Sequence, residues 1–85
     1  MTKKDITIKL ASGLEARPVA LLVQVASQYE ASVYIDTDDK HVNAKSIMGM
    51  MSLGLDTGDE LTVLADGPDE EAAVEGVAKY LSGEA

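Results

Sequence analysis

Apolar residues alternate with polar ones near the start of the chain and then recur with helical spacing. Every second residue of 5–10 is apolar, which predicts a strand with one buried face. These apolar positions are Ile6, Ile8 and Leu10. From Pro18 onward apolar residues recur every three or four positions, which predicts a helix over about 17–28 with the proline in its first turn. Its apolar stripe consists of Val19, Leu22, Val23 and Ala26. Leu21 and Val25 widen the stripe, so we expect the helix to lie flat against a sheet.

The middle of the chain predicts a hairpin followed by a short helix. Residues 33–35 are strand formers, and the polar turn 36–40 separates them from a second short strand at 41–43. Ser46 is well suited to cap a short helix from 47 to about 53, because its hydroxyl can accept a hydrogen bond from a free backbone N–H group.

The last part of the chain predicts a fourth strand and a third helix. Residues 60–65 form the strand, and the turn at 66–68 leads into a helix with carboxylates at 69–71 in its first turn, where negative charge suits the helix dipole. Its apolar stripe consists of Ala73, Val74, Val77, Ala78 and Leu81. The order β-α-β-β-α-β-α predicts a single α+β domain over 1–85, with two layers and every helix on one face of one sheet.

Composition and charge exclude several classes of function. The 85 residues include seven basic and fifteen acidic side chains, which give a formal net charge of −8 at pH 7. Nucleic acids and anionic membrane surfaces bind patches of lysine and arginine, so we expect neither as a direct partner. The chain has no cysteine and therefore no disulfide, thiolate nucleophile or cysteine metal site. Its polar start and the lack of a long apolar run predict a soluble, cytoplasmic protein.

The turn at 13–18 is the first place with candidate chemistry. It leads into a helix N-terminus, where free N–H groups, the helix dipole and Arg17 together would favour an anion. Ordinary helix initiation accounts for the same residues. Glu15 likewise fits a carboxylate that is stabilised near the start of a helix.

The segment 45–52 is the second such place. A phosphate on Ser46 would add a charge of about −1.5 to −2 where N–H groups are unpaired and the helix end is partly positive. Four apolar side chains surround this serine: Ile47, Met48, Met50 and Met51. A helix of about two turns cannot turn all four toward one core, so some are exposed and form an adaptable interface. The alternative interpretation is that the methionines fill an uneven core.

The remaining polar residues give little sign of catalysis or metal binding. His41 stands without cysteine or a second histidine, which is typical of a solvated strand residue. Asp36, Asp38 and Asp39 lack the glycine and glutamate that a calcium loop needs at its sixth and twelfth positions, where His41 and Ile47 stand. Glycine-rich phosphate loops and nucleophile-elbow motifs are also absent from the sequence. We therefore expect no catalytic residue, metal or cofactor, and a protein that is not an enzyme.

Two segments resemble the HPr family, the phosphocarriers of the bacterial sugar phosphotransferase system. Residues 13–18, Gly-Leu-Glu-Ala-Arg-Pro, are similar to the family's active-site stretch Gly-(Ile/Leu)-His-Ala-Arg-Pro. Residues 42–53 are similar to its regulatory serine region, and residues 66–70 fall where the family has a strand-to-helix turn. The resemblance runs nearly end to end. It implies an HPr-like open-faced β-sandwich of four antiparallel strands with three helices on one face, in agreement with the order of elements above.

The resemblance breaks at the active site and holds at the regulatory serine. Phosphocarriers have a histidine at position 15, which takes the phosphoryl group from Enzyme I, and this chain has Glu15. A carboxylate lacks the ring nitrogen, so the resemblance implies that phosphotransfer to sugars is lost. In Gram-positive relatives the serine matching Ser46 is phosphorylated by HPr kinase/phosphorylase, and the product is a corepressor of the catabolite control protein CcpA. The chain most resembles the catabolite repression subgroup, Crh, which keeps this serine and lacks the histidine.

The resemblance also implies roles for single residues. Ser46 is the phosphoacceptor, Arg17 pairs with the phosphoserine, and Glu15 faces the partner. The apolar contact patch corresponds to Ile47, Met48 and Met51. The implied partners are HPr kinase/phosphorylase and a CcpA-type repressor, and the unpaired edges of the outer strands allow a monomer or a dimer. Two alternatives are a phosphocarrier with another acceptor and an interaction module that works without phosphorylation.

Overall fold

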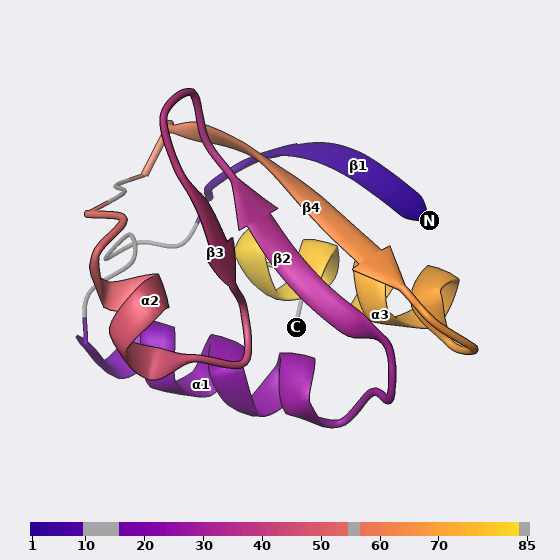
Figure 1. The fold of residues 1–85 in the computed structure, drawn as a ribbon. Coiled ribbons are helices and arrows are strands. Elements are labelled where there is room, and N and C mark those ends of the chain that lie inside the picture. Colours follow the sequence, from indigo (N-terminus) through magenta and orange to yellow (C-terminus); the bar gives the residue numbers. More distant parts are fainter. Residues whose placement is uncertain (10–15, 55–56, 84–85) are drawn as a thin grey trace.

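One antiparallel sheet is covered on one face by helices (Figure 1). The computed structural model describes residues 1–9, 16–54 and 57–83, with only the backbone described at 16–18. Within these ranges the strands are β1 (Thr2–Thr7), β2 (Ser32–Asp36), β3 (His41–Asn43) and β4 (Glu60–Asp66). The helices are α1 (Ala16–Ser27), α2 (Ile47–Met51) and α3 (Glu70–Leu81). None of these helices is long and apolar enough to cross a membrane. The element order, strand order β1-β4-β2-β3 and antiparallel pairing confirm the predicted α+β fold.

The first strand begins earlier than the alternation predicts. The predicted bounds 5–10 were wrong, because β1 pairs with β4 along its whole length, beginning with Thr2 opposite Ala65. The predicted buried face is correct, since Ile8 is fully buried although it lies just beyond the strand. Leu10 lies outside the described residues. Local alternation therefore identified the face of the strand, whereas pairing with β4 determines its bounds.

The two long helices bury the stripes that their spacing predicts. In α1 the buried residues are Val19, Leu22, Val23 and Ala26. In α3 they are Ala73, Val74, Val77, Ala78 and Leu81. Val25 packs at the edge of this core, but Leu21 is 43% exposed, so the prediction that it widens the buried stripe was wrong. An amphipathic helix buries only the arc that faces the core, and Leu21 falls outside this arc.

Hydrogen bonds join the connection between α1 and β2 to the connection between β4 and α3. Asp69 was predicted in the first turn of the last helix, but it lies just before α3, and its carboxylate makes no capping hydrogen bond to that helix. That carboxylate accepts hydrogen bonds from the N–H groups of Glu30 at 3.0 Å and Ala31 at 2.8 Å. These two bonds hold the pKa of Asp69 below its usual value. Gly67 lies against the same segment, where an added Cβ would stand 2.6 Å from the Cα of Ala31.

Candidate functional site

Ser46 caps the short helix α2, as predicted. Its backbone is extended, with φ −109° and ψ 114°, and its hydroxyl accepts a hydrogen bond from the N–H of Gly49 at 3.2 Å. The residue is half-buried. The helix ends at Met51 rather than near Leu53, because the chain tightens there and the N–H of Leu53 donates to the carbonyl of Met50 at 3.2 Å. The cap is therefore formed by residues close together in sequence, and α2 ends in a tight turn.

The apolar side chains of α2 divide between the core and the surface. Met50 is fully buried. The exposed fractions are 48% for Ile47, 86% for Met48 and 52% for Met51. We call these three residues the α2 patch. Met50 thus fills the core, and the predicted exposure of some methionines beside Ser46 is confirmed. That this exposed surface is an interface stays a prediction.

The division among the methionines has a measurable consequence. We expect Met50→Ala to lower the free energy of unfolding by about 2–5 kcal/mol, because it opens a cavity in the core. The matched variant Met48→Ala removes an exposed side chain and should change stability by at most about 0.5 kcal/mol. Urea unfolding followed by circular dichroism measures both values. Equal losses in the two variants would contradict this assignment of core and surface.

Two lysines contact the backbone near the ends of α2. The ammonium of Lys40 donates to the carbonyl of Ser52, just past the C-terminal end, at 2.5 Å. The ammonium of Lys45, beside the cap, donates to the carbonyl of Tyr29 at 2.7 Å. Neither contact was predicted from the sequence. Lys40 lies in the hairpin turn and Lys45 in the connection between β3 and α2, and no local sequence pattern indicates which carbonyl group each lysine contacts.

The active-site-like segment is only partly described. Glu15 lies outside the described residues, and Arg17 is described by its backbone alone, in the first turn of α1. The structure places α1 and α2 in contact. The roles that the resemblance implies for Glu15 and Arg17 stay predictions.

His41 lies on the edge strand β3, on the exposed surface of the hairpin. Its ring stacks on that of Tyr34, with centroids 4.7 Å apart, and its Nδ1 pairs with the carboxylate of Asp36 in the facing strand. The prediction of a solvated strand residue is confirmed.

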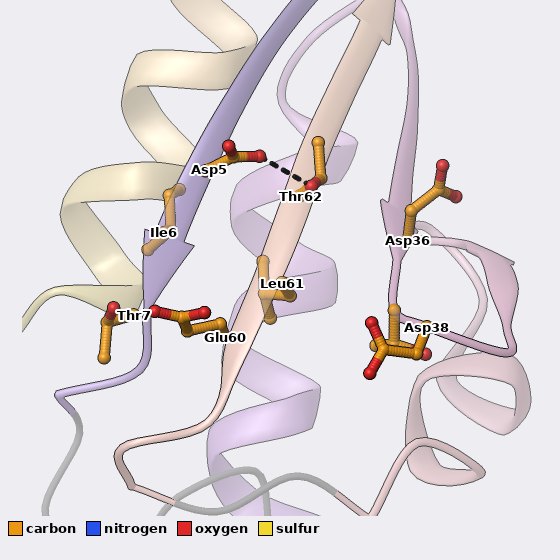
Figure 2. A pocket seen from close by; sticks show the side chains of 9 residues that line it. Asp5, Ile6, Thr7, Asp36, Asp38, Glu60, Leu61 and Thr62 are labelled. Atoms are coloured by element: carbon orange, nitrogen blue, oxygen red, sulfur yellow. Dashed lines mark hydrogen bonds between the residues drawn. The ribbon is translucent and has the colours of Figure 1, made fainter.

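A carboxylate-rich hollow lies at one end of the sheet, where β1, β4 and the β2–β3 turn meet. Figure 2 shows the carboxylates of Asp5, Asp36, Asp38 and Glu60 around it, and the hydroxyl of Thr62 donates to Asp5 at 2.7 Å. Within the described ranges no three histidine, cysteine or carboxylate side chains are grouped so that they could hold a metal ion. The negative charge of this hollow disfavours anions.

Comparison with known proteins identifies the family of this fold. A family model described as "PTS HPr component phosphorylation site" matches residues 2–82. The HPr-like protein Crh of Bacillus subtilis is 46% identical over 84 residues, which is 99% of both chains. The HPr-like protein Crh of Halalkalibacterium halodurans is 43% identical over 84 residues, 99% of this chain and 100% of the relative.

Solved structures agree with the fold. The crystal structure of HPr-C-His from Thermoanaerobacter tengcongensis superposes with a TM-score of 0.93 at 43% identity, covering 99% of this chain and 94% of the other. A crystal structure of Crh from Bacillus subtilis, described as a domain-swapped, intertwined dimer, gives a TM-score of 0.80 at 46% identity, covering 99% and 97%. The similarity spans nearly the whole chain in sequence and in structure, and the chain belongs to the HPr family.

Proposed function

We propose that this chain is a regulatory phosphoprotein of carbon catabolite repression. HPr kinase/phosphorylase phosphorylates Ser46, and the phosphorylated form acts as corepressor of a CcpA-type repressor. The observation that carries the proposal is the position of Ser46, which is half-buried at the end of α2 beside three exposed apolar side chains. The similarity to relatives named Crh supports the regulatory role.

Phosphate on Ser46 acts as a charge switch. The modification adds about −1.5 to −2 of charge next to the α2 patch. A partner with a basic pocket ringed by apolar residues then gains charge-assisted hydrogen bonds that the unmodified serine does not offer. Each such bond is typically worth about 1.5–3 kcal/mol, or roughly a 10- to 150-fold gain in affinity. In this proposal Arg17 pairs with the phosphate, and Glu15 borders the partner.

Glu15 removes the other activity of the family. A carboxylate offers no ring nitrogen for a phosphoryl group, and an acyl phosphate would have to form against its negative charge. The protein therefore takes no part in phosphotransfer to sugars and works without a catalytic residue, metal or cofactor. Incubation with phosphoenolpyruvate and Enzyme I should transfer no phosphate, whereas a phosphocarrier that uses another acceptor would become labelled.

The direct test is the intact mass of the protein after incubation with ATP and HPr kinase/phosphorylase. We expect the mass of one phosphate, located on Ser46 by peptide mapping. Incubation without ATP is the control. An unchanged mass, or a phosphate located on Ser52 at the other end of α2, would overturn the proposal.

A further inference from the structure

Lys45 precedes the cap but extends away from α2. Its ammonium donates to the carbonyl of Tyr29, sixteen residues earlier in the chain, at 2.7 Å, and the contact is partly buried. Tyr29 lies just beyond the C-terminal end of α1, where the N–H of Tyr29 still bonds back to the carbonyl of Ala26. A cation is favourable at this end of a helix, because the last carbonyl groups carry partial negative charge.

Tyr29, whose carbonyl accepts this bond, is held by its side chain and by the residues that follow it. The hydroxyl of Tyr29 lies against Gly76 of α3, where an added Cβ would stand 2.2 Å from it. The next two N–H groups of the chain bond to the carboxylate of Asp69. Lys45 also lies close enough to Asp69 to contribute to the lowered pKa of that carboxyl. The ammonium of Lys45 is thus attached to a well-supported part of the fold, near the negative charge of Asp69.

The backbone of Lys45 is held by hydrogen bonds in the connection between β3 and α2. Its N–H donates to the side-chain oxygen of Asn43 at 2.8 Å, and the N–H of Ser46 donates to the carbonyl of Asn43 at 3.0 Å. Ala44 is fully buried, and its N–H donates to the carbonyl of Val33 at 2.8 Å. The bond from Lys45 to Tyr29 therefore adds a link to α1 immediately before the serine that caps α2.

We propose that Lys45 is a positioning residue for Ser46: by tying the β3–α2 connection to the end of α1, it holds the Ser46 hydroxyl in the orientation that the kinase phosphorylates. This inference rests on the proposed function of Ser46. Because the ammonium already donates to the carbonyl of Tyr29, Lys45 acts within the folded chain and not as a basic recognition residue for the kinase.

The experiment compares three variants in steady-state phosphorylation by HPr kinase/phosphorylase and ATP. Lys45→Met removes the donor and keeps the length, and kcat should fall about tenfold while KM changes less than about twofold, since the α2 patch is intact. Lys45→Arg keeps a cationic donor, and its kcat should stay within about twofold of the unsubstituted protein. Lys40→Met is the matched control, because it loses the same charge and a bond to a backbone carbonyl at the other end of α2. Its kcat should also stay within about twofold.

Three kinetic outcomes would overturn the positioning role. These are unchanged kinetics in Lys45→Met, an equal loss in Lys40→Met, and a raised KM in both Lys45 variants, which would mean that the kinase binds the lysine directly. If the unsubstituted chain accepts no phosphate, the proposed function fails, and hydrogen exchange of the Gly49 amide still tests the positioning. That amide donates to the Ser46 hydroxyl, so its exchange should be faster in Lys45→Met than in Lys45→Arg. Equal exchange in the two variants would overturn the inference.

Discussion

Replacing Ser46 with alanine is expected to abolish phosphate-dependent binding to a CcpA-type repressor. The variant has no hydroxyl to phosphorylate, so the partner loses the charge-assisted contacts and retains only the α2 patch. One such contact corresponds to at least about tenfold in affinity. Calorimetric titration of the repressor with kinase-treated protein measures the difference between the variant and the unsubstituted chain.

The control for this experiment is Ser52→Ala, at the other end of the same helix. The hydroxyl of Ser52 donates to the carbonyl of Gly49 at 2.6 Å, so this variant also loses a local hydrogen bond of α2 but keeps Ser46. It should bind like the unsubstituted chain after treatment with the kinase. Ser46→Ala also removes the helix cap, at a cost of about 0.5–2 kcal/mol, so thermal unfolding must show that the variant is folded. Undiminished binding by kinase-treated Ser46→Ala would contradict the charge switch.

Gly67→Ala is expected to lower the free energy of unfolding by about 2–4 kcal/mol. The added Cβ would lie 2.6 Å from the Cα of Ala31 and 3.0 Å from its Cβ. Ala31 is buried, and the N–H of Ala31 is bonded to Asp69, so the backbone cannot move aside without breaking that contact. The backbone at Gly67, with φ +155°, adds strain for any larger residue. Urea unfolding monitored by circular dichroism gives the change.

Gly54→Ala separates the effect of crowding from that of backbone conformation. Gly54 has φ +60°, but nothing lies within 4 Å of an added Cβ, so only the conformational cost of about 1–2 kcal/mol applies. A loss in Gly67→Ala no larger than in Gly54→Ala would mean that the two connections can separate freely. Ala31, which lies against Gly67, is two residues from Tyr29, whose carbonyl accepts the bond from Lys45. If the two connections separate freely, Tyr29 is a less rigid anchor for Lys45.

Much of the fold could be predicted from the sequence because each element carries its own periodic pattern. The spacing of apolar residues located α1 and α3 together with their buried stripes. The bounds of β1 could not be predicted in this way, since its first residues include Lys3 and Lys4, and only pairing with β4 makes them a strand. The exposure of Leu21 is a further miss, because the width of a buried stripe depends on the shape of the surface beneath it.

The candidate site also has features that the sequence predicts and features that it does not. The Ser46 cap was predictable, since a cap involves a hydroxyl and an N–H only three residues apart. The presence of some exposed methionines also followed from the length of α2. Which of them are exposed did not follow, and the structure buries Met50 and exposes Met48.

The sequence by itself determined the order of the elements, the helix cap at Ser46 and the glutamate at position 15, because these are properties of neighbouring residues or of single residues. Only the tertiary structure decided that Lys45 bonds to Tyr29, sixteen residues away, and that Asp69 bonds to Ala31, thirty-eight residues away. Such contacts form when packing of the helices on the sheet brings distant backbone groups together, and no local pattern records which donor will meet which acceptor.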